Sequence, residues 1–145
     1  MTNLYSVLLN KHREEFNSLP LAFAFSDKQF EEGMGNLGLQ PHEVDKVVSI
    51  GAGGFMLKSD KHKYVDMLNK HEEDMHSAIN NSETGEQFIF DMFNYELANH
   101  EYIITFEIDD AIRALGLTVD EIEADERLSN GLKKARQYQR ENAIY

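Results

Sequence analysis

The stretch Gln87-Phe-Ile-Phe-Asp-Met-Phe-Asn-Tyr-Glu-Leu-Ala-Asn-His-Glu-Tyr102 is the most apolar candidate helix in the chain. Its side chains Ile89 and Phe93 are four residues apart, so they lie on the same face of a helix. We therefore expect a helix over residues 86–104. The remaining elements are predicted on either side of it.

Several other segments have helical patterns. Apolar residues at intervals of three to four predict helices over residues 3–18 and about 60–80, the second capped by Ser59. Capping patterns and glycine stops predict shorter helices over residues 26–37 (stopped at Gly38), from Pro41, over 108–115 and from Thr118. The last predicted helix, 126–142, carries basic residues that complement a helix dipole, namely Lys133, Lys134, Arg136 and Arg140.

Strand signals are confined to two places. The runs Lys46–Ile50 and Phe55–Leu57 flank the glycine-rich turn Gly51-Ala-Gly-Gly54, which predicts a β-hairpin. The alternating stretch Leu21–Phe25 predicts a short strand. At 145 residues, the chain is expected to be a single α+β domain over residues 1–145, mostly helical with one small hairpin.

The charge of the chain is concentrated in one block. The net charge is −12, and no lysine or arginine occurs between His71 and Ile112. The flanking parts are nearly balanced, with nine acids and eight bases in residues 1–70 and six of each in 113–145. The block contains eleven carboxylates: Glu72, Glu73, Asp74, Glu83, Glu86, Asp91, Glu96, Glu101, Glu107, Asp109 and Asp110.

This composition limits the partners and the compartment. An acidic block repels nucleic acid and attracts cations or basic surfaces. No segment approaches the roughly 20 apolar residues that a membrane span requires. The chain has no cysteine, which is compatible with a reducing compartment. We expect a soluble cytoplasmic protein without a membrane or a direct nucleic-acid partner.

Two interpretations of the acidic block stay open. Its carboxylates either only keep the protein dispersed, or imitate duplex phosphates and occupy a basic groove on another protein. The second interpretation predicts a partner-binding acidic face formed by Glu72, Glu73, Asp74, Glu83, Glu86, Asp91, Glu101, Glu107, Asp109 and Asp110.

A metal site is the alternative from a different class of function. Glu96 and His100 share a helix face, and His71 lies on the apolar stripe of the preceding helix. Two imidazoles and a carboxylate are suitable ligands for zinc or iron. The usual spacings of metal-binding motifs are missing, however, and a buried hydrogen-bonded pair explains Glu96 and His100 more simply.

No other motif predicts catalysis. Gly51–Gly54 lacks the Lys-Ser/Thr of a phosphate-binding loop and continues as a strand, so a tight turn explains its glycines. The serines fit caps, turns or strand positions, and no nucleophile motif is present. We expect no cofactor and no enzymatic activity.

Five segments carry a resemblance to a known family. They are Ser49–Phe55 with Lys58–Asp60, Phe90–Tyr102, Phe25–Gly33 and Leu115–Leu117. Together they resemble a family of small acidic proteins carried by phages and integrative conjugative elements of Gram-positive bacteria. The resemblance implies no catalytic residues. It implies an accessory gene on a mobile element, acting in the bacterial host cell.

These observations lead to one preferred function and two alternatives. The preferred hypothesis is a non-enzymatic acidic protein that inhibits a host defence nuclease, of the anti-CRISPR or anti-restriction type. The alternatives are a small metal-dependent enzyme or metal-stabilised protein using His71, Glu96 and His100, and a structural or regulatory homodimer with the helix 86–104 as its interface.

Overall fold

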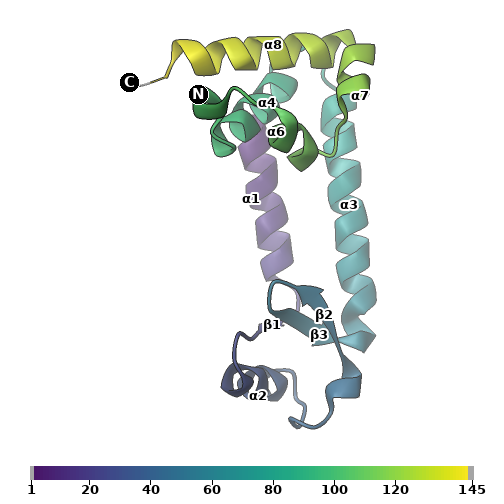
Figure 1. Cartoon of the computed structure of the whole chain (residues 1–145). Helices are drawn as coiled ribbons and strands as arrows, with labels where there is room; N and C mark the ends of the chain where they lie inside the picture. Colours follow the sequence, from purple (N-terminus) through teal and green to yellow (C-terminus); the bar gives the residue numbers. More distant parts are fainter. Residues whose placement is uncertain (1, 144–145) are drawn as a thin grey trace. The chain divides into compact units, whose positions relative to one another are not determined.

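A computed structural model describes residues 2–143 and divides the chain into two compact units (Figure 1). The helical unit contains the residues up to Lys11 and those from Asp74 onward, and the sheet unit contains His12–Glu73. Helices α1 (Leu4–Asn17) and α3 (Lys61–Asn80) contribute residues to both units. The prediction of a mainly helical α+β fold is confirmed, while the single domain over residues 1–145 stays a prediction.

The sheet unit is built around a three-stranded antiparallel sheet with the order β1-β3-β2. The predicted hairpin is confirmed as β2 (Val47–Gly51) and β3 (Gly54–Leu57), and the predicted strand 21–25 is present as the short edge strand β1 (Ala22–Phe23). The turn residues Gly51, Ala52 and Gly53 all have positive φ angles, so the conformation of this turn accounts for its two glycines.

The helix predicted over residues 26–37 is present as α2 (Asp27–Asn36), which packs on this sheet. The Ser26 hydroxyl accepts a hydrogen bond from the Gln29 backbone N–H, and Gly38 follows the helix with a φ of 79°. Met34 of α2 is fully buried in a small core with Ala22 and Phe55. The predicted helix from Pro41 is wrong in position, because only a 3-10 turn, η1 (Val44–Lys46), forms after it.

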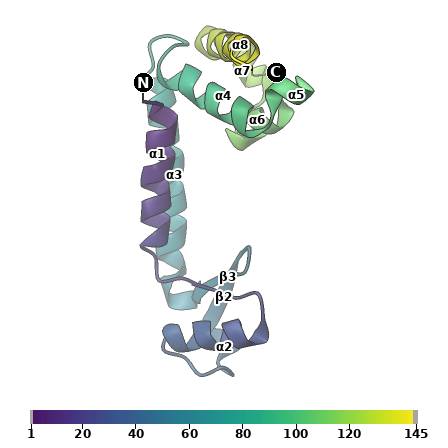
Figure 2. The ribbon, with the colours of Figure 1, turned by 90° about the vertical axis from the view of Figure 1, so that its left-hand side faces the viewer.

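The helical unit is organised around α4 (Phe88–Asn99) and α8 (Glu126–Glu141), which pack against each other (Figure 2). Ile89, Met92, Phe93 and Leu97 of α4 are completely buried. The facing side of α8 is apolar as well, so the apolar stripes of both helices are removed from water. The unit also contains α5 (Tyr102–Thr105), α6 (Asp109–Ala114) and α7 (Val119–Ala124).

The predicted helix caps after β3 are only partly confirmed. Thr118 caps α7 as expected, with its hydroxyl accepting a hydrogen bond from the Glu121 N–H. Asp125 caps α8 and also pairs with Arg127. The expected Ser59 cap is wrong, because Ser59 lies in a 3-10 turn, η2 (Lys58–Asp60), ahead of α3.

The prediction of one continuous helix over residues 86–104 is wrong. Helix α4 ends at Asn99, Glu101 adopts a left-handed conformation with a φ of 57°, and α5 starts at Tyr102. The break places the Tyr102 ring in the core, where it is 1% exposed, and its hydroxyl accepts a hydrogen bond from Arg136 Nε of α8 at 3.0 Å. Tertiary packing of Tyr102 therefore overrides local helix propensity.

Two glycines allow the loop before α4 to contact α8 directly. A Cβ atom on Gly131 would lie 2.5 Å from Ile89 Cγ2 and 2.8 Å from the carbonyl oxygen of Gly85. A Cβ atom on Gly85 would lie 2.5 Å from the carbonyl oxygen of Arg127. Because backbone atoms form part of each contact, a larger side chain cannot be accommodated by a rotamer change.

We expect the substitution Gly131→Ala to destabilise the protein by about 1–3 kcal/mol, because overpacking outweighs the gain in helix propensity. Gly35→Ala is the matched control, since a Cβ atom on this helical glycine meets nothing within 4 Å. That control should raise stability by about 0.5–1 kcal/mol. Urea unfolding followed by circular dichroism measures both, and equal effects of the two substitutions would contradict the packing argument.

Candidate functional site: an acidic corner of the helical unit

The predicted acidic residues are distributed over both units. Glu72 and Glu73 belong to the sheet unit, and the other eight belong to the helical unit. The helical unit has fifteen carboxylates and seven bases, a formal charge of −8, and the sheet unit has eleven and seven, a charge of −4. The predicted common face of all ten residues stays a prediction.

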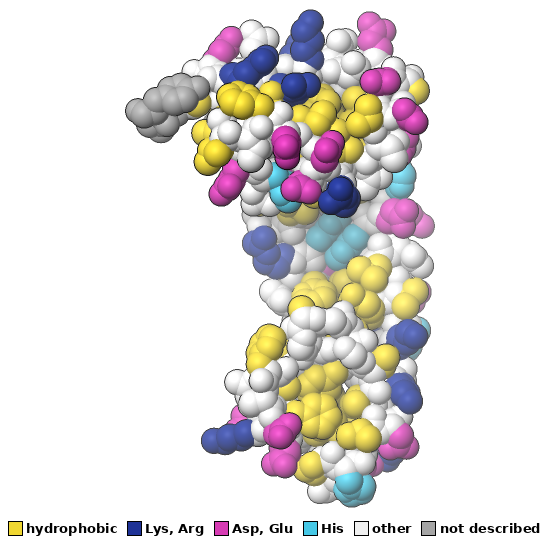
Figure 3. Space-filling view, in the orientation of Figure 1, with side chains coloured by type: hydrophobic (Ala, Val, Ile, Leu, Met, Phe, Trp, Pro, Cys, Tyr) yellow, Lys and Arg dark blue, Asp and Glu magenta, His cyan; other side chains and the backbone are white. Residues whose placement is uncertain are grey.

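Several of these carboxylates make contacts within the helical unit. Asp91 Oδ2 accepts a hydrogen bond of 2.8 Å from the Leu4 N–H at the start of α1. Asp74 lies 3.9 Å from Lys11 Nζ. Glu86 pairs with Lys134 of α8, and this hydrogen bond lowers the pKa of the Glu86 carboxyl. On the face of this unit seen in Figure 3, acidic side chains gather in separate groups with Lys or Arg beside some of them.

Exposed acids and exposed apolar side chains occur together in the segment that follows α4. We call residues 101–110 the acidic corner; it contains α5 and the start of α6. Its apolar residues Ile104 and Phe106 are 71% and 56% exposed. Its four carboxylates are all exposed: Glu101, Glu107, Asp109 and Asp110.

The backbone of the acidic corner is held in an unusual conformation. Glu101 and Phe106, at its two bends, have φ angles of 57° and 58°, a region that favours glycine. The Phe106 N–H donates to the Tyr102 carbonyl at 2.7 Å, and the Phe106 and Tyr102 rings meet edge to face at 5.9 Å. The Glu107 N–H donates to the Thr105 hydroxyl at 3.1 Å. The exposed Phe106 is therefore held in place by buried Tyr102.

Glu96 and His100 are in contact, as the sequence predicts, but as part of a buried polar cluster. Glu96 is 6% exposed, and its Oε1 accepts a hydrogen bond of 2.8 Å from the Tyr5 hydroxyl. His100 Nε2 lies 3.2 Å from Glu96 Oε2, an ion-pair distance, without forming a hydrogen bond. Burial, together with the hydrogen bond and charge of Glu96, raises the pKa of the Tyr5 phenol well above its usual value.

His71, the third residue of the predicted metal site, belongs to the sheet unit. Its Nε2 lies 3.2 Å from Glu15 Oε2, and its ring stacks on that of His12 with the centroids 3.8 Å apart. Across residues 2–143, no group of three or more His, Asp or Glu side chains is arranged to hold a metal ion.

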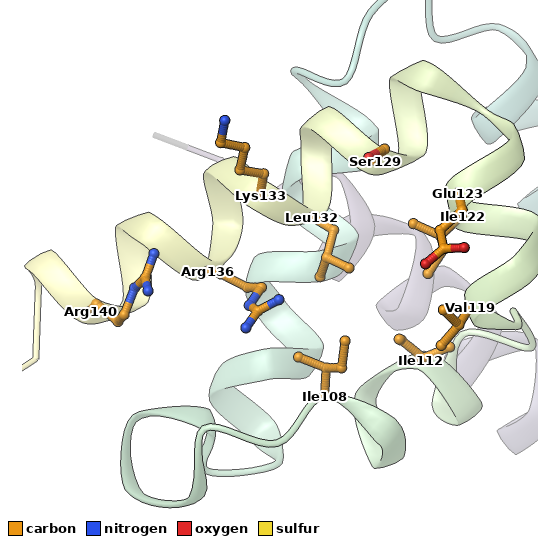
Figure 4. Close-up of a pocket in the computed structure, with 10 residues that line it drawn as sticks. All are labelled: Ile108, Ile112, Val119, Ile122, Glu123, Ser129, Leu132, Lys133, Arg136 and Arg140. Carbon is orange, nitrogen blue, oxygen red and sulfur yellow. The ribbon is translucent and has the colours of Figure 1, made fainter.

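A pocket that the sequence did not predict lies beside Arg136, the partner of Tyr102. Residues of α6, α7 and α8 line a cavity of about 450 Å³ (Figure 4). The side chains of Lys133, Arg136 and Arg140 border it, although the sequence analysis assigned these bases only to the helix dipole. Their spacing of three and four residues places them on one face of α8, and this spacing could have revealed the basic face but not the pocket beside it.

The fold and the site define a small acidic α+β protein, mainly helical, with a charged and apolar surface corner. The chain belongs to a family of unknown function, DUF7659, whose model matches residues 4–138. No curated protein and no solved structure matches the chain significantly. None of the helices within residues 2–143 is long and apolar enough to cross a membrane.

We expect Tyr5→Phe to destabilise the protein by about 1–3 kcal/mol, because the buried Glu96 carboxylate loses a hydrogen-bond donor. The exposed Tyr138 provides the matched control, Tyr138→Phe, which should change stability little. Urea unfolding at neutral pH measures both changes.

The same pair of variants tests the raised pKa of Tyr5. Below the unfolded-state pKa of about 10, Tyr5 is neutral in both states and its contribution is complete. At higher pH the unfolded state ionises while the folded state does not, so stability falls. Above about pH 10, Tyr5→Phe should therefore lose less stability per pH unit than the wild type or Tyr138→Phe. Parallel curves for all three proteins would refute the assignment.

Proposed function

We propose that this protein is a non-enzymatic protein-binding module that docks its acidic corner on a basic surface of a nucleic-acid-binding protein. The partner class we favour is a host defence nuclease, whose nucleic-acid site the carboxylates would occupy. Inhibition would then be of the anti-CRISPR or anti-restriction type. The mobile-element context implied by the sequence resemblance supports this choice of partner.

The observation that carries the proposal is the exposure of Ile104 and Phe106 among carboxylates. Burying each such side chain in an interface contributes about 1.5–3 kcal/mol relative to leaving it in water. Apolar anchors surrounded by a polar rim are the usual anatomy of a protein interface. The rim here is acidic, so the complementary surface is basic.

The strained backbone at Phe106 supports the same conclusion. A left-handed conformation costs about 1–2 kcal/mol at a residue other than glycine. Strain of this kind is stored where a side chain must be presented in one position. The contact between Phe106 and Tyr102 holds that position before any partner arrives, so less entropy is lost on binding.

The other carboxylates contribute at longer range. The helical unit has a net charge of −8, which accelerates the encounter with a basic partner and weakens with salt. This role does not require that Glu72, Glu73, Asp74, Glu83, Glu86 and Asp91 touch the partner. It also excludes duplex DNA or RNA as a direct ligand of the acidic corner, because like charges repel.

We expect the wild-type protein to release labelled duplex DNA from a susceptible nuclease in a panel of purified CRISPR effectors and restriction enzymes. Release should weaken as salt rises, because the contact is electrostatic. The double substitution Glu107→Lys with Asp109→Lys should weaken it at least tenfold, since two attractive charges become repulsive. Fluorescence anisotropy of the DNA measures the release.

The charge-matched control is Glu31→Lys with Glu32→Lys on α2, which alters two exposed acids of the sheet unit. It changes the net charge equally but leaves the acidic corner intact. If the control weakens release as much as the test variant, net charge alone explains binding. If no nuclease of the panel releases its DNA, the proposed partner class is wrong.

The substitution Phe106→Asn separates binding from folding. Asparagine tolerates the left-handed conformation, which offsets the lost contact with Tyr102, so stability should change by less than about 1 kcal/mol. DNA release should weaken at least tenfold, because the apolar anchor is gone. Unfolding curves and the anisotropy assay measure the two effects, and unchanged release would place the interface elsewhere.

A further inference from the structure

The pocket between α6, α7 and α8 has a mixed lining, with five apolar residues and five polar or charged ones. Its wall includes Ile108 and Ile112 from α6 and the preceding loop, Val119 and Ile122 from α7, and Leu132 from α8. In Figure 4 these side chains converge on one space, with Arg136 extending from α8 toward Ile108. The volume of about 450 Å³ lies within the range of small-molecule sites, about 300–1,000 Å³.

Within residues 2–143, no ion pair forms at three basic residues of this pocket, namely Lys133, Arg136 and Arg140. They stay unpaired among these residues although the chain carries 26 carboxylates. Neighbouring Lys134, by contrast, is paired with Glu86. Arg136 is also fixed in direction, because its Nε donates to the Tyr102 hydroxyl and its guanidinium lies 5.6 Å from that ring centroid. Its outer nitrogens remain as donors for an anion.

The two ends of the pocket differ in charge. Arg136 and Arg140 lie on the α8 side, whereas Glu123 lies beside Ile122 on α7 (Figure 4). A ligand with an apolar body and one anionic head group would place the head at Arg136 and the body along the isoleucines. A second anionic group at the opposite end would approach Glu123 and be repelled.

We propose that this pocket binds a small amphipathic monoanion, held by Arg136 through its head group and by the isoleucine wall through its apolar body. The site is independent of the proposed function, because it requires neither the partner protein nor the carboxylates of the acidic corner. A carboxylate, a sulfonate and a phosphate diester share the monoanionic head-group chemistry that a guanidinium fork recognises.

The test is a titration of the ¹⁵N-labelled protein with sodium octanoate, followed by NMR. We expect saturable shifts of the amides lining the pocket. Arg136→Gln should weaken binding at least tenfold, since one charge-assisted hydrogen bond is lost. Val119→Glu, at a half-exposed position on the rim, should weaken it similarly without touching the Arg136–Tyr102 contact. Lys134→Gln removes a charge from the same helix outside the pocket and should leave binding unchanged.

Two further ligands test the assigned polarity. 1-Octanol has the same body without the charge, and octanedioate adds a second carboxylate that would meet Glu123. Both should bind at least tenfold more weakly than octanoate. The inference is overturned if octanoate gives no saturable shifts in the pocket, if 1-octanol binds as well, or if Lys134→Gln weakens binding as much as Val119→Glu.

Discussion

The helical unit depends on the packing of α4 against α8. Four α4 side chains have no exposure, and the apolar side of α8 covers them. Burial of this apolar area is the main favourable term in the folding of the unit. Close approach of the backbones at Gly85 and Gly131 fixes the position of α8 relative to the loop before α4. The contact between Arg136 of α8 and Tyr102 of α5 depends on that position.

The contact between Tyr102 and Arg136 connects the two surfaces of interest. On one side, the Tyr102 ring supports Phe106 in the acidic corner. On the other side, the Tyr102 hydroxyl directs Arg136 into the pocket. Buried Tyr102 therefore supports the exposed Phe106 in the acidic corner. It also orients the Arg136 guanidinium at the pocket. The two surfaces adjoin at Ile108, which belongs to the acidic corner and also lines the pocket.

The parts of the fold that were predicted correctly are those decided by local chemistry. The hairpin follows from its glycine turn, and the starts of α2 and α7 follow from the hydroxyl caps Ser26 and Thr118. The break at Glu101 was missed because it arises from burial of Tyr102, a long-range effect. The pocket was missed for the same reason, since its residues come from three helices whose packing no local pattern encodes.

The acidic block also illustrates the limit of a linear charge pattern. Within it, Asp91 caps α1, Glu86 pairs with α8, and Glu96 is buried against Tyr5. Each makes a specific contact in the folded chain, so proximity in sequence does not make these acids one surface. The carboxylates of the acidic corner are exposed, and they share their segment with the exposed apolar residues Ile104 and Phe106. Solubility explains the exposed carboxylates but not the exposure of Ile104 and Phe106 to water. The proposed binding of a partner protein explains both the charge and the apolar exposure.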